Sequence, residues 1–356
     1  ESAIGFLYKN ANEEKMEPEE KIWGSAFLSL IHAEYILEML KIKPHAVLGF
    51  CSGETHAILA HGIWKDLGAL REDIQKKEVF SHELGGDFQV ISNRWGLFSE
   101  EQNTLPWQSY RVFAPKDVVL DAIVHERRVF LTIINAPTDI VISGDPVACL
   151  RVVQALKQKS IRTLDFNISV HTPEIKDYWE PYWQIHSRET YPNLNIRFYS
   201  AYLGDTYVLT QEKIADALTG QIMNCVDFPN LIEKAWEDGI RVFIEHGPHS
   251  ACSKWIHQIL GDKEHVAVGL DYYGESSLNR VLMTTAQLFA VGVPMELEEL
   301  RSRLNELELN STPLLFSKTS KRFPAHLATI PQKLSLFQSQ VKYLLLAPVL
   351  PSPFDP

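Results

Sequence analysis

Cysteine is scarce and scattered in this chain of 356 residues. Its four cysteines, Cys51, Cys149, Cys225 and Cys252, form no CxxC pair, and no histidine stands close enough to suggest a zinc cluster. Widely separated single cysteines are typical of reduced thiols in a cytoplasmic protein rather than of a disulfide framework. We therefore predict a cytoplasmic location and no metal site.

Long apolar runs are also missing. No segment has the roughly 18 uninterrupted apolar residues that a membrane-spanning helix needs, and the N-terminus has no signal-peptide pattern. The apolar fraction of 45% and the charged fraction of 22% are instead ordinary for a globular protein. A chain of this length can bury the core of one large domain together with a smaller inserted or appended one.

Basic charge is in deficit. Lysine and arginine total 34 against 45 aspartates and glutamates, which gives a net charge of −11 with neutral histidines. This balance argues against nucleic acid as a partner, because phosphate backbones are bound by lysine and arginine. An acidic protein partner would need a local basic patch on this surface.

The chain does contain a sharp strand-to-helix turn around Cys51. A short apolar run that ends at Gly49 predicts a buried strand, and the alanine- and leucine-rich segment after Gly53 predicts a helix. A Gly-x-Cys-x-Gly turn presents a reactive side chain at a strand end, because larger residues at the glycines would clash across the bend. The helix N-terminus there favours a thiolate and a developing oxyanion. Alternatively, the glycines only close a turn and Cys51 is a small buried apolar residue.

The middle of the chain predicts a separate small domain. Strand-like runs at 110–113, 128–135, 139–143 and 161–166 alternate with helical segments at 116–126 and 147–159, and 136–138 predicts a hairpin turn. The resulting β-α-β-β-α-β order predicts a ferredoxin-like domain inserted at 106–168.

The flanking segments predict a second, larger α/β unit. Its expected strands are 4–8, the run before Cys51, 195–200, 241–245 and 266–270, and its expected helices are 22–39, 67–79, 211–221, 228–237, 250–260 and 278–291. We assign 1–105 and 169–305 to this large domain. The proline-rich segment 306–356 is interpreted as a tail or linker, so 266–270 is the last strand expected.

Four separated motifs then occur in a fixed order. They are VLGFCSGE at 47–54, INAP at 134–137 running into VISGDP at 141–146, SVHTP at 169–173, and VFIEHGPH at 242–249. In order and spacing they resemble the acyltransferase domain of polyketide and fatty-acid synthases, over about residues 23–300. The segments 53–64 and 131–135 look closest to the acyltransferase subunit of polyunsaturated-fatty-acid and heterocyst-glycolipid synthases. The resemblance implies an α/β-hydrolase-like large domain that carries the active site in a cleft beside the small domain.

The resemblance also implies roles for particular residues. The nucleophile falls on Cys51 and the catalytic histidine on His171, which is oriented by the backbone carbonyl of Gln221. One oxyanion N–H falls on Ser52, and Asn135 matches an asparagine that supports the same cleft. The implied reaction moves an acyl group from acyl-CoA or an acyl carrier, through Cys51, to the pantetheine thiol of an acyl carrier protein. Other synthase modules or subunits are implied partners, and no metal or redox cofactor is required.

This sequence departs from the family pattern in several places. Cysteine replaces the usual serine, which is chemically permissible because a thiol is the better nucleophile. Lys76 aligns with the arginine that pairs the carboxylate of malonyl-type substrates, but lysine lacks the bidentate fork and could simply be a solvated helix residue. Phe50 and Val170 make the pocket more apolar, which favours an uncharged acyl group. The Pro-Gly-Gln-Gly loop that holds a second oxyanion donor is replaced by the sequence YKNA at 8–11.

Other interpretations remain open from the sequence. The same dyad with water as acceptor would be a thioesterase, and the altered nucleophile and missing loop would also suit a catalytically weak docking subunit of a synthase. Ser52 is an alternative nucleophile, although it would stand one residue beyond the bend. Among the thirteen histidines, His56 and His61 are interpreted as structural, whereas for His246 and His249, which flank a Gly-Pro turn, a capping role and a chemical role both remain open.

Overall fold

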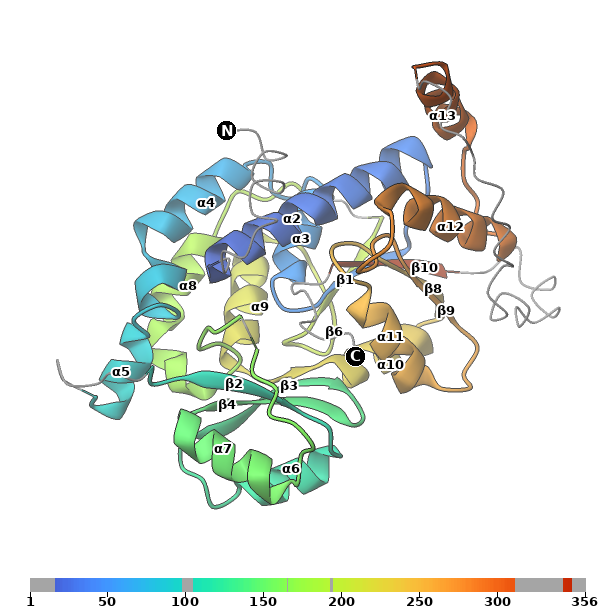
Figure 1. The fold of residues 1–356 in the computed structure, drawn as a ribbon. Helices are drawn as coiled ribbons and strands as arrows, with labels where there is room; N and C mark the ends of the chain where they lie inside the picture. Colours follow the sequence, from blue (N-terminus) through green and yellow to red (C-terminus); the bar gives the residue numbers. More distant parts are fainter. Residues whose placement is uncertain (1–16, 98–104, 165, 193–194, 311–341, 348–356) are drawn as a thin grey trace.

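The computed structural model describes residues 17–97, 105–164, 166–192, 195–310 and 342–347, and its strands form two sheets (Figure 1). The large sheet consists of β1 (Ala46–Gly49), β5 (Arg197–Ser200), β6 (Asp205–Tyr207), β8 (Ile240–Glu245), β9 (Val266–Gly269) and β10 (Lys342–Ala347), in the order β6-β5-β1-β10-β8-β9. The small sheet consists of β2 (Gln108–Val112), β3 (Val129–Ala136), β4 (Asp139–Gly144) and β7 (Val226–Asp227), in the order β2-β4-β3-β7. The mixed α/β class expected from the sequence is therefore present.

The helices largely follow the expected segments. In chain order they are α2 (Pro18–Glu34), η1 (Tyr35–Met39), α3 (Gly53–Ala60), α4 (Leu67–Lys76), η2 (Val79–Glu83), α5 (Gln89–Trp95), α6 (Lys116–Ile123), α7 (Pro146–Ala155), η3 (Pro173–Tyr178), α8 (Trp179–His186), α9 (Gln211–Met223), α10 (Phe228–Glu237), α11 (Ala251–Leu260), α12 (Ser277–Ala290) and α13 (Glu298–Asn310). The helix expected at 22–39 continues from α2 into the π-helical turn η1. In the described ranges, no helix has the length and apolar character needed to cross a bilayer.

The large sheet is parallel except for its edge strand β6. Every residue of β1 is buried, as expected of a strand that is covered on both faces. Helices α2 and α3 contact each other and α3 contacts β1, so the helix after Cys51 lies directly against the strand before it. The centre of the large sheet thus holds the strand-to-helix turn that the sequence singled out.

The position of β10 corrects the sequence prediction. Strand 266–270 was expected to be the last, yet β10 lies in the segment interpreted as a tail, parallel to and between β1 and β8 (Figure 1). Its Ala347 is in register with Gly49, two residues before Cys51. A short apolar run between prolines carries no local signal that it pairs with a sheet, because the pairing partners lie far away in sequence. The strand expected at 4–8 and the sequence at 8–11 lie outside the described residues.

The small sheet follows the expected order through β2, α6, β3, β4 and α7, with the hairpin between β3 and β4 as predicted. The expected strand at 161–166 is wrong: Thr163 makes only an isolated antiparallel bridge with Tyr110. Residues 157–163 are mostly exposed, so little apolar burial supports a longer ladder there. The opposite edge instead gains β7, which pairs in parallel with β3.

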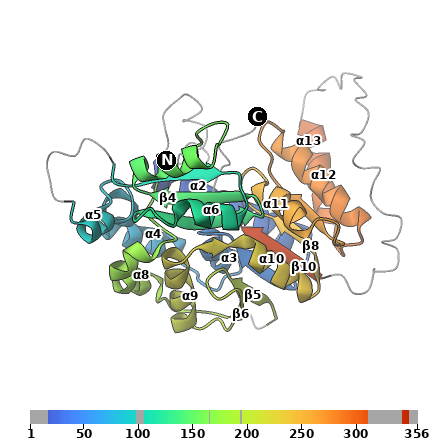
Figure 2. The same cartoon turned by 90° about the horizontal axis from the view of Figure 1, so that it is seen from below.

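Different helices cover the two faces of the small sheet. Helices α6 and α7 cover the outer face, away from the large sheet, and the view from below in Figure 2 shows the same layer. On the inner side, α10 and α11 both contact β3. The small sheet therefore packs against the same helices that flank the strands of the large sheet.

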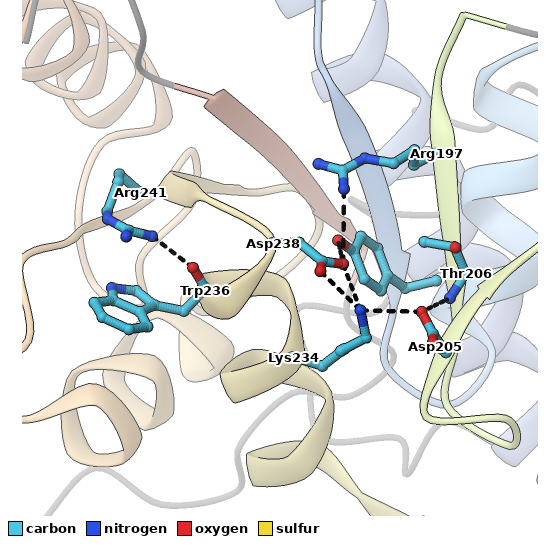
Figure 3. Close-up of polar contacts among 8 residues, drawn as sticks. Arg197, Asp205, Thr206, Lys234, Trp236, Asp238 and Arg241 are labelled. Carbon is cyan, nitrogen blue, oxygen red and sulfur yellow. Dashed lines mark hydrogen bonds and ion pairs between the residues drawn. The ribbon is translucent and has the colours of Figure 1, made fainter.

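A network of charged side chains joins α10 to the β5–β6 hairpin (Figure 3). Lys234 Nζ lies 2.7 Å from an oxygen of Asp238 and 3.3 Å from Asp205 Oδ1, and Tyr199 donates its hydroxyl to Asp238 at 2.7 Å. Arg197 also approaches Asp238, at 3.6 Å. Isolated exposed ion pairs contribute little, but a shared network holds several elements in one arrangement. Here it holds α10 against the β5–β6 hairpin, whose turn residue Ala201 donates its N–H to Glu54.

We expect removal of β10 to unfold or strongly destabilise the protein. A chain ending at residue 310 would leave β1 and β8 without their shared neighbour and should lose more than about 4 kcal/mol of unfolding free energy, because central backbone pairs are left unmade. Denaturant titration followed by circular dichroism measures this. A chain ending at residue 347 is the control and should match the full chain. Equal stability of the 310-residue form would show that β10 is dispensable.

Candidate active site

The turn after β1 places Cys51 between strand and helix, as predicted. Cys51 has a φ of 54°, in the left-handed region that residues with a Cβ adopt rarely, and α3 begins two residues later. At Gly49 a Cβ would stand 1.9 Å from the backbone nitrogen of Glu54, so the strand and the helix touch there. The backbone is therefore held in a strained bend by close packing, which is a common feature of functional sites.

His171 meets Cys51 across the molecule. Its Nε2 lies 3.0 Å from Cys51 Sγ, and its Nδ1 lies 2.9 Å from the backbone oxygen of Gln221. A carbonyl oxygen can only accept, so Nδ1 carries the proton and Nε2 presents a lone pair to the thiol. His171 also has a positive φ, 61°, and its backbone N–H donates to the carbonyl of Ile222. The structure thus brings together Cys51, His171 and Gln221, residues 120 and 50 positions apart in sequence.

Glu54 is a functional residue that the sequence analysis missed. It is fully buried in the first turn of α3, and its Oε2 accepts a hydrogen bond from Gln221 Nε2 at 2.9 Å and from the Ala201 N–H at 3.4 Å. Gln221 is therefore held by its side chain while its backbone carbonyl orients His171. The contacts close a ring from Cys51 through α3 to Glu54, Gln221 and His171. A glutamate next to Gly53 in the turn motif was the available signal.

Burial keeps the dyad uncharged at rest. Desolvation raises the pKa of the Cys51 thiol to about 12, against the opposing hydrogen bond from the Ser52 backbone. Desolvation also lowers the pKa of His171 to about 4, although its bond to the Gln221 carbonyl favours the charged form. The resting thiol is therefore not the thiolate that was expected at this helix N-terminus, because loss of water raises the pKa of Cys51 more than the Ser52 backbone hydrogen bond lowers it. The pair is a neutral thiol facing a neutral imidazole near pH 7.

The remaining predicted residues divide between those near the dyad and those elsewhere. Ser52 places its Oγ 3.4 Å from His56 Nε2 and not toward His171, which disfavours it as the nucleophile. Val170, the residue before His171, and Phe50, the residue before Cys51, are both buried. Phe50 packs edge-on against Phe228, with ring centroids 5.3 Å apart.

Asn135 and Lys76 are placed differently from the dyad. Asn135 is buried near the end of β3 and donates its Nδ2 hydrogen to Asp139 Oδ1 at 3.1 Å. Its side-chain amide therefore binds within the β3–β4 hairpin. Lys76 is exposed at the last residue of α4, whereas both dyad residues are buried. Within the described part of the chain, no group of three or more histidine, cysteine, aspartate or glutamate side chains could hold a metal ion.

Comparisons with known proteins bear on the fold that carries this site. No family model matches the chain. The chain is 25% identical over 271 residues to one subunit of the polyunsaturated fatty acid synthase of Thraustochytrium sp., covering 72% of this chain and 13% of that relative. The acyltransferase domain from the second module of the salinomycin polyketide synthase superposes with a TM-score of 0.66 at 17% identity, over 88% of this chain and 69% of that one. The chain has the acyltransferase-domain fold.

A second acyltransferase structure extends the comparison. A type II polyketide malonyl-transacylase, solved in complex with its acyl-carrier protein, matches with a TM-score of 0.61 at 16% identity, over 79% of this chain and 86% of that one. The resemblance to acyltransferase domains of polyketide and fatty-acid synthases is therefore confirmed. The chain spans only 13% and 6% of two synthase relatives, so the activities of those whole synthases belong to much longer chains.

We expect Gly49→Ala to disrupt the acyltransferase fold at its turn. The new methyl would overlap the backbone of Glu54, which cannot move without displacing α3, and a loss of about 3 kcal/mol or more of unfolding free energy should follow. The matched control is Gly24→Ala in α2, where a Cβ meets no atom within 4 Å and the helix should gain up to about 1 kcal/mol. Parallel denaturant titrations compare them, and equal stability of the two variants would contradict the close contact at Gly49.

We expect the protein to lose stability as pH falls from 6.5 to about 4. Burial lowers the pKa of seven histidines, which therefore stay neutral in the folded chain while the unfolded chain protonates them; they are His32, His56, His61, His171, His186, His246 and His257. Burial raises the pKa of Glu54 and Glu245 to about 7, and the hydrogen bond to Asp87 raises the pKa of His82, so these groups act in the opposite direction.

Urea titration at pH 7.5 and pH 4.5 measures this effect. His56→Leu should reduce the difference between the two midpoints, because one buried titrating ring is removed. The exposed His125→Leu serves as the matched control and should leave the difference unchanged. A midpoint that does not move with pH would contradict the neutral burial of these rings.

Proposed function

We propose that the chain is an acyltransferase domain that moves an acyl group from acyl-CoA or an acyl carrier, through a Cys51 thioester, to the pantetheine thiol of an acyl carrier protein. The observation that carries the proposal is the 3.0 Å approach of His171 Nε2 to Cys51 Sγ, with Nδ1 held by the Gln221 carbonyl. This is a nucleophile within reach of an oriented base.

The first half-reaction forms the acyl-enzyme. His171 Nε2 takes the Cys51 proton as Sγ attacks the thioester carbonyl, and the oxyanion develops against the Ser52 N–H at the start of α3. When the intermediate collapses, the carbon–sulfur bond to the donor breaks and the departing thiolate takes the proton from His171. The enzyme then carries a thioester on Cys51 and a neutral imidazole.

The second half-reaction reverses the proton path. The pantetheine thiol of the acceptor gives its proton to His171 and attacks the Cys51 thioester, and Cys51 leaves with that proton. No oxidant, metal or redox cofactor enters the balance. Because the resting dyad is neutral, proton removal and attack are coupled, and no free thiolate needs to persist between turnovers.

The names of the relatives support the partners proposed here. One relative is a polyunsaturated fatty acid synthase subunit and one structural neighbour binds an acyl-carrier protein. The apolar neighbours Phe50 and Val170, together with the exposed position of Lys76, support an uncharged acyl group rather than a malonyl-type one. A cytoplasmic location and association with other synthase modules are proposed on the same basis.

We further propose that the two sheets mark two domains. The large sheet would be the core of an α/β-hydrolase-like domain built from 1–105 and 169–305 together with β10, which lies beyond these bounds at 342–347. The small sheet would be the core of a ferredoxin-like domain at 106–168, with β7 at 226–227 added at its edge from the second part of the large domain. The order β2, α6, β3, β4, α7 supports the second assignment.

Intact-protein mass spectrometry after mixing with a panel of acyl-CoAs tests the function. The wild type should gain one acyl mass and Cys51→Ala none, whereas Cys225→Ala, which removes a half-buried thiol elsewhere, should keep the adduct. His171→Ala should slow acylation about 100- to 10,000-fold, the usual contribution of a general base. An adduct that persists in Cys51→Ala would contradict the proposal.

The product separates the rival activities. Transfer of the acyl group from the enzyme to holo acyl carrier protein supports the transferase, and release of free acid in its place would indicate a thioesterase. No adduct from any acyl-CoA at any pH would favour a docking subunit without catalysis.

A further inference from the structure

A cavity of about 300 Å³ lies beside the hydrophobic cluster that contains Phe50 and Cys51. Its lining includes none of the residues assigned to catalysis. Its walls come from the end of β2, the tip of the β3–β4 hairpin and the first turns of α11. The lining residues used below are Arg111, Phe113, Asp139, Lys254 and Trp255.

The cavity is basic in a chain that is acidic. Arg111 and Lys254 line it. The guanidinium of Arg162 stacks on the ring of Phe113, which is also a lining residue, at 4.9 Å from the ring centroid. Asp139 is the acidic side chain among the lining residues. The local balance is therefore positive, against a net charge of −11 for the whole chain. This is the kind of local basic patch that an anionic partner of such a chain requires.

The basic side chains of the cavity are held in place before any ligand binds. Arg111 donates from Nε to Asp139 Oδ1 at 2.8 Å and forms a second bond through Nη2, and Trp255 Nε1 donates to Asp139 Oδ2 at 2.9 Å. Arg111 also lies over the Phe113 ring, 5.2 Å from its centroid. Lys254 is exposed, and its Nζ lies over the Tyr272 ring, 4.6 Å from the centroid, so its ammonium is a point charge at the edge of the cavity.

One side chain connects the cavity to the nucleophile. Trp255 lines the cavity and also packs on Phe50, with ring centroids 5.3 Å apart, and Phe50 is the residue before Cys51. Cys51 and Phe50 belong to the same buried cluster, against which Trp255 packs. The cavity is therefore separated from the residue before Cys51 by the single side chain of Trp255.

We infer that this cavity binds the phosphoryl group of the phosphopantetheine-type thioester, with Lys254 as its principal cation. The inference rests on the proposed function, because that function requires a donor or acceptor with a phosphate at one end of a pantetheine arm and a reacting sulfur at the other. Both CoA and the prosthetic arm of a carrier protein carry this phosphoryl group. Charge-assisted contacts to phosphate anchor the arm, and the uncharged remainder reaches toward Cys51.

Acylation kinetics of Cys51 with matched donors test the inference. Lys254→Ala should raise the KM for acyl-CoA about tenfold, a loss of about 1.4 kcal/mol, with kcat unchanged. The same variant should leave the KM for the corresponding acyl-pantetheine, which has no phosphate, unchanged. Lys254→Arg should restore most of the affinity, and Lys263→Ala, near the end of α11, is the control that should alter neither donor.

The donors also identify the source of the phosphate. A loss with both acyl-CoA and acyl carrier protein would indicate the phosphoryl group that both arms share, and a loss with acyl-CoA alone would indicate the nucleotide phosphates of CoA. An equal loss with acyl-pantetheine, or no loss with either phosphorylated donor, would overturn the inference.

Binding of CoA to the Cys51→Ala variant separates this inference from the proposed function. Isothermal titration calorimetry should show CoA binding to Cys51→Ala that weakens when Lys254→Ala is combined with it. The affinity for pantetheine, which has no phosphate, should not change. Such a result with no acylation of the wild type would refute the transferase and retain the phosphate site. Acylation of Cys51 that does not depend on Lys254 would refute the phosphate site and retain the transferase.

Discussion

The close contact between the end of β1 and the start of α3 is the constraint on which the site depends. Gly49 lies against the backbone of Glu54, and the chain between them turns through Cys51 with a positive φ. The same first turn of α3 that forces this bend also delivers Glu54 to Gln221. One tight turn therefore fixes the position of Cys51 and, through Gln221, the orientation of His171.

Burial determines how this dyad can work. With the thiol pKa raised to about 12 and the imidazole pKa lowered to about 4, an ion pair is disfavoured in the resting dyad. In the reaction proposed above, the helix N-terminus would contribute most when charge develops on the oxyanion, and less to the resting thiol. A cysteine held this way is protected from ionisation, and so from side reactions of a free thiolate.

The small sheet supplies Asp139, a buried carboxylate that accepts hydrogen bonds from several side chains near the site. Its hairpin places Asp139 where Arg111, Asn135 and Trp255 all donate to it, and Trp255 in turn packs on Phe50. A buried carboxylate with several donors holds side chains from the small sheet and from α11 in fixed positions. The basic cavity and the catalytic turn are thus two faces of one packed junction between the sheets.

The sequence by itself determined the local parts of this protein: the strand-turn-helix at Cys51, the β3–β4 hairpin, most helices, and through its ordered motifs the acyltransferase resemblance with Cys51, His171 and Gln221. These follow from short-range patterns, in which spacing and glycine placement restrict the backbone directly. Only the tertiary structure decided that β10 enters the centre of the large sheet, that 161–166 makes a single bridge, that Glu54 supports Gln221, and that the dyad is neutral. The physical reason is that strand pairing and desolvation depend on groups far apart in the chain, and no local pattern records which of them meet.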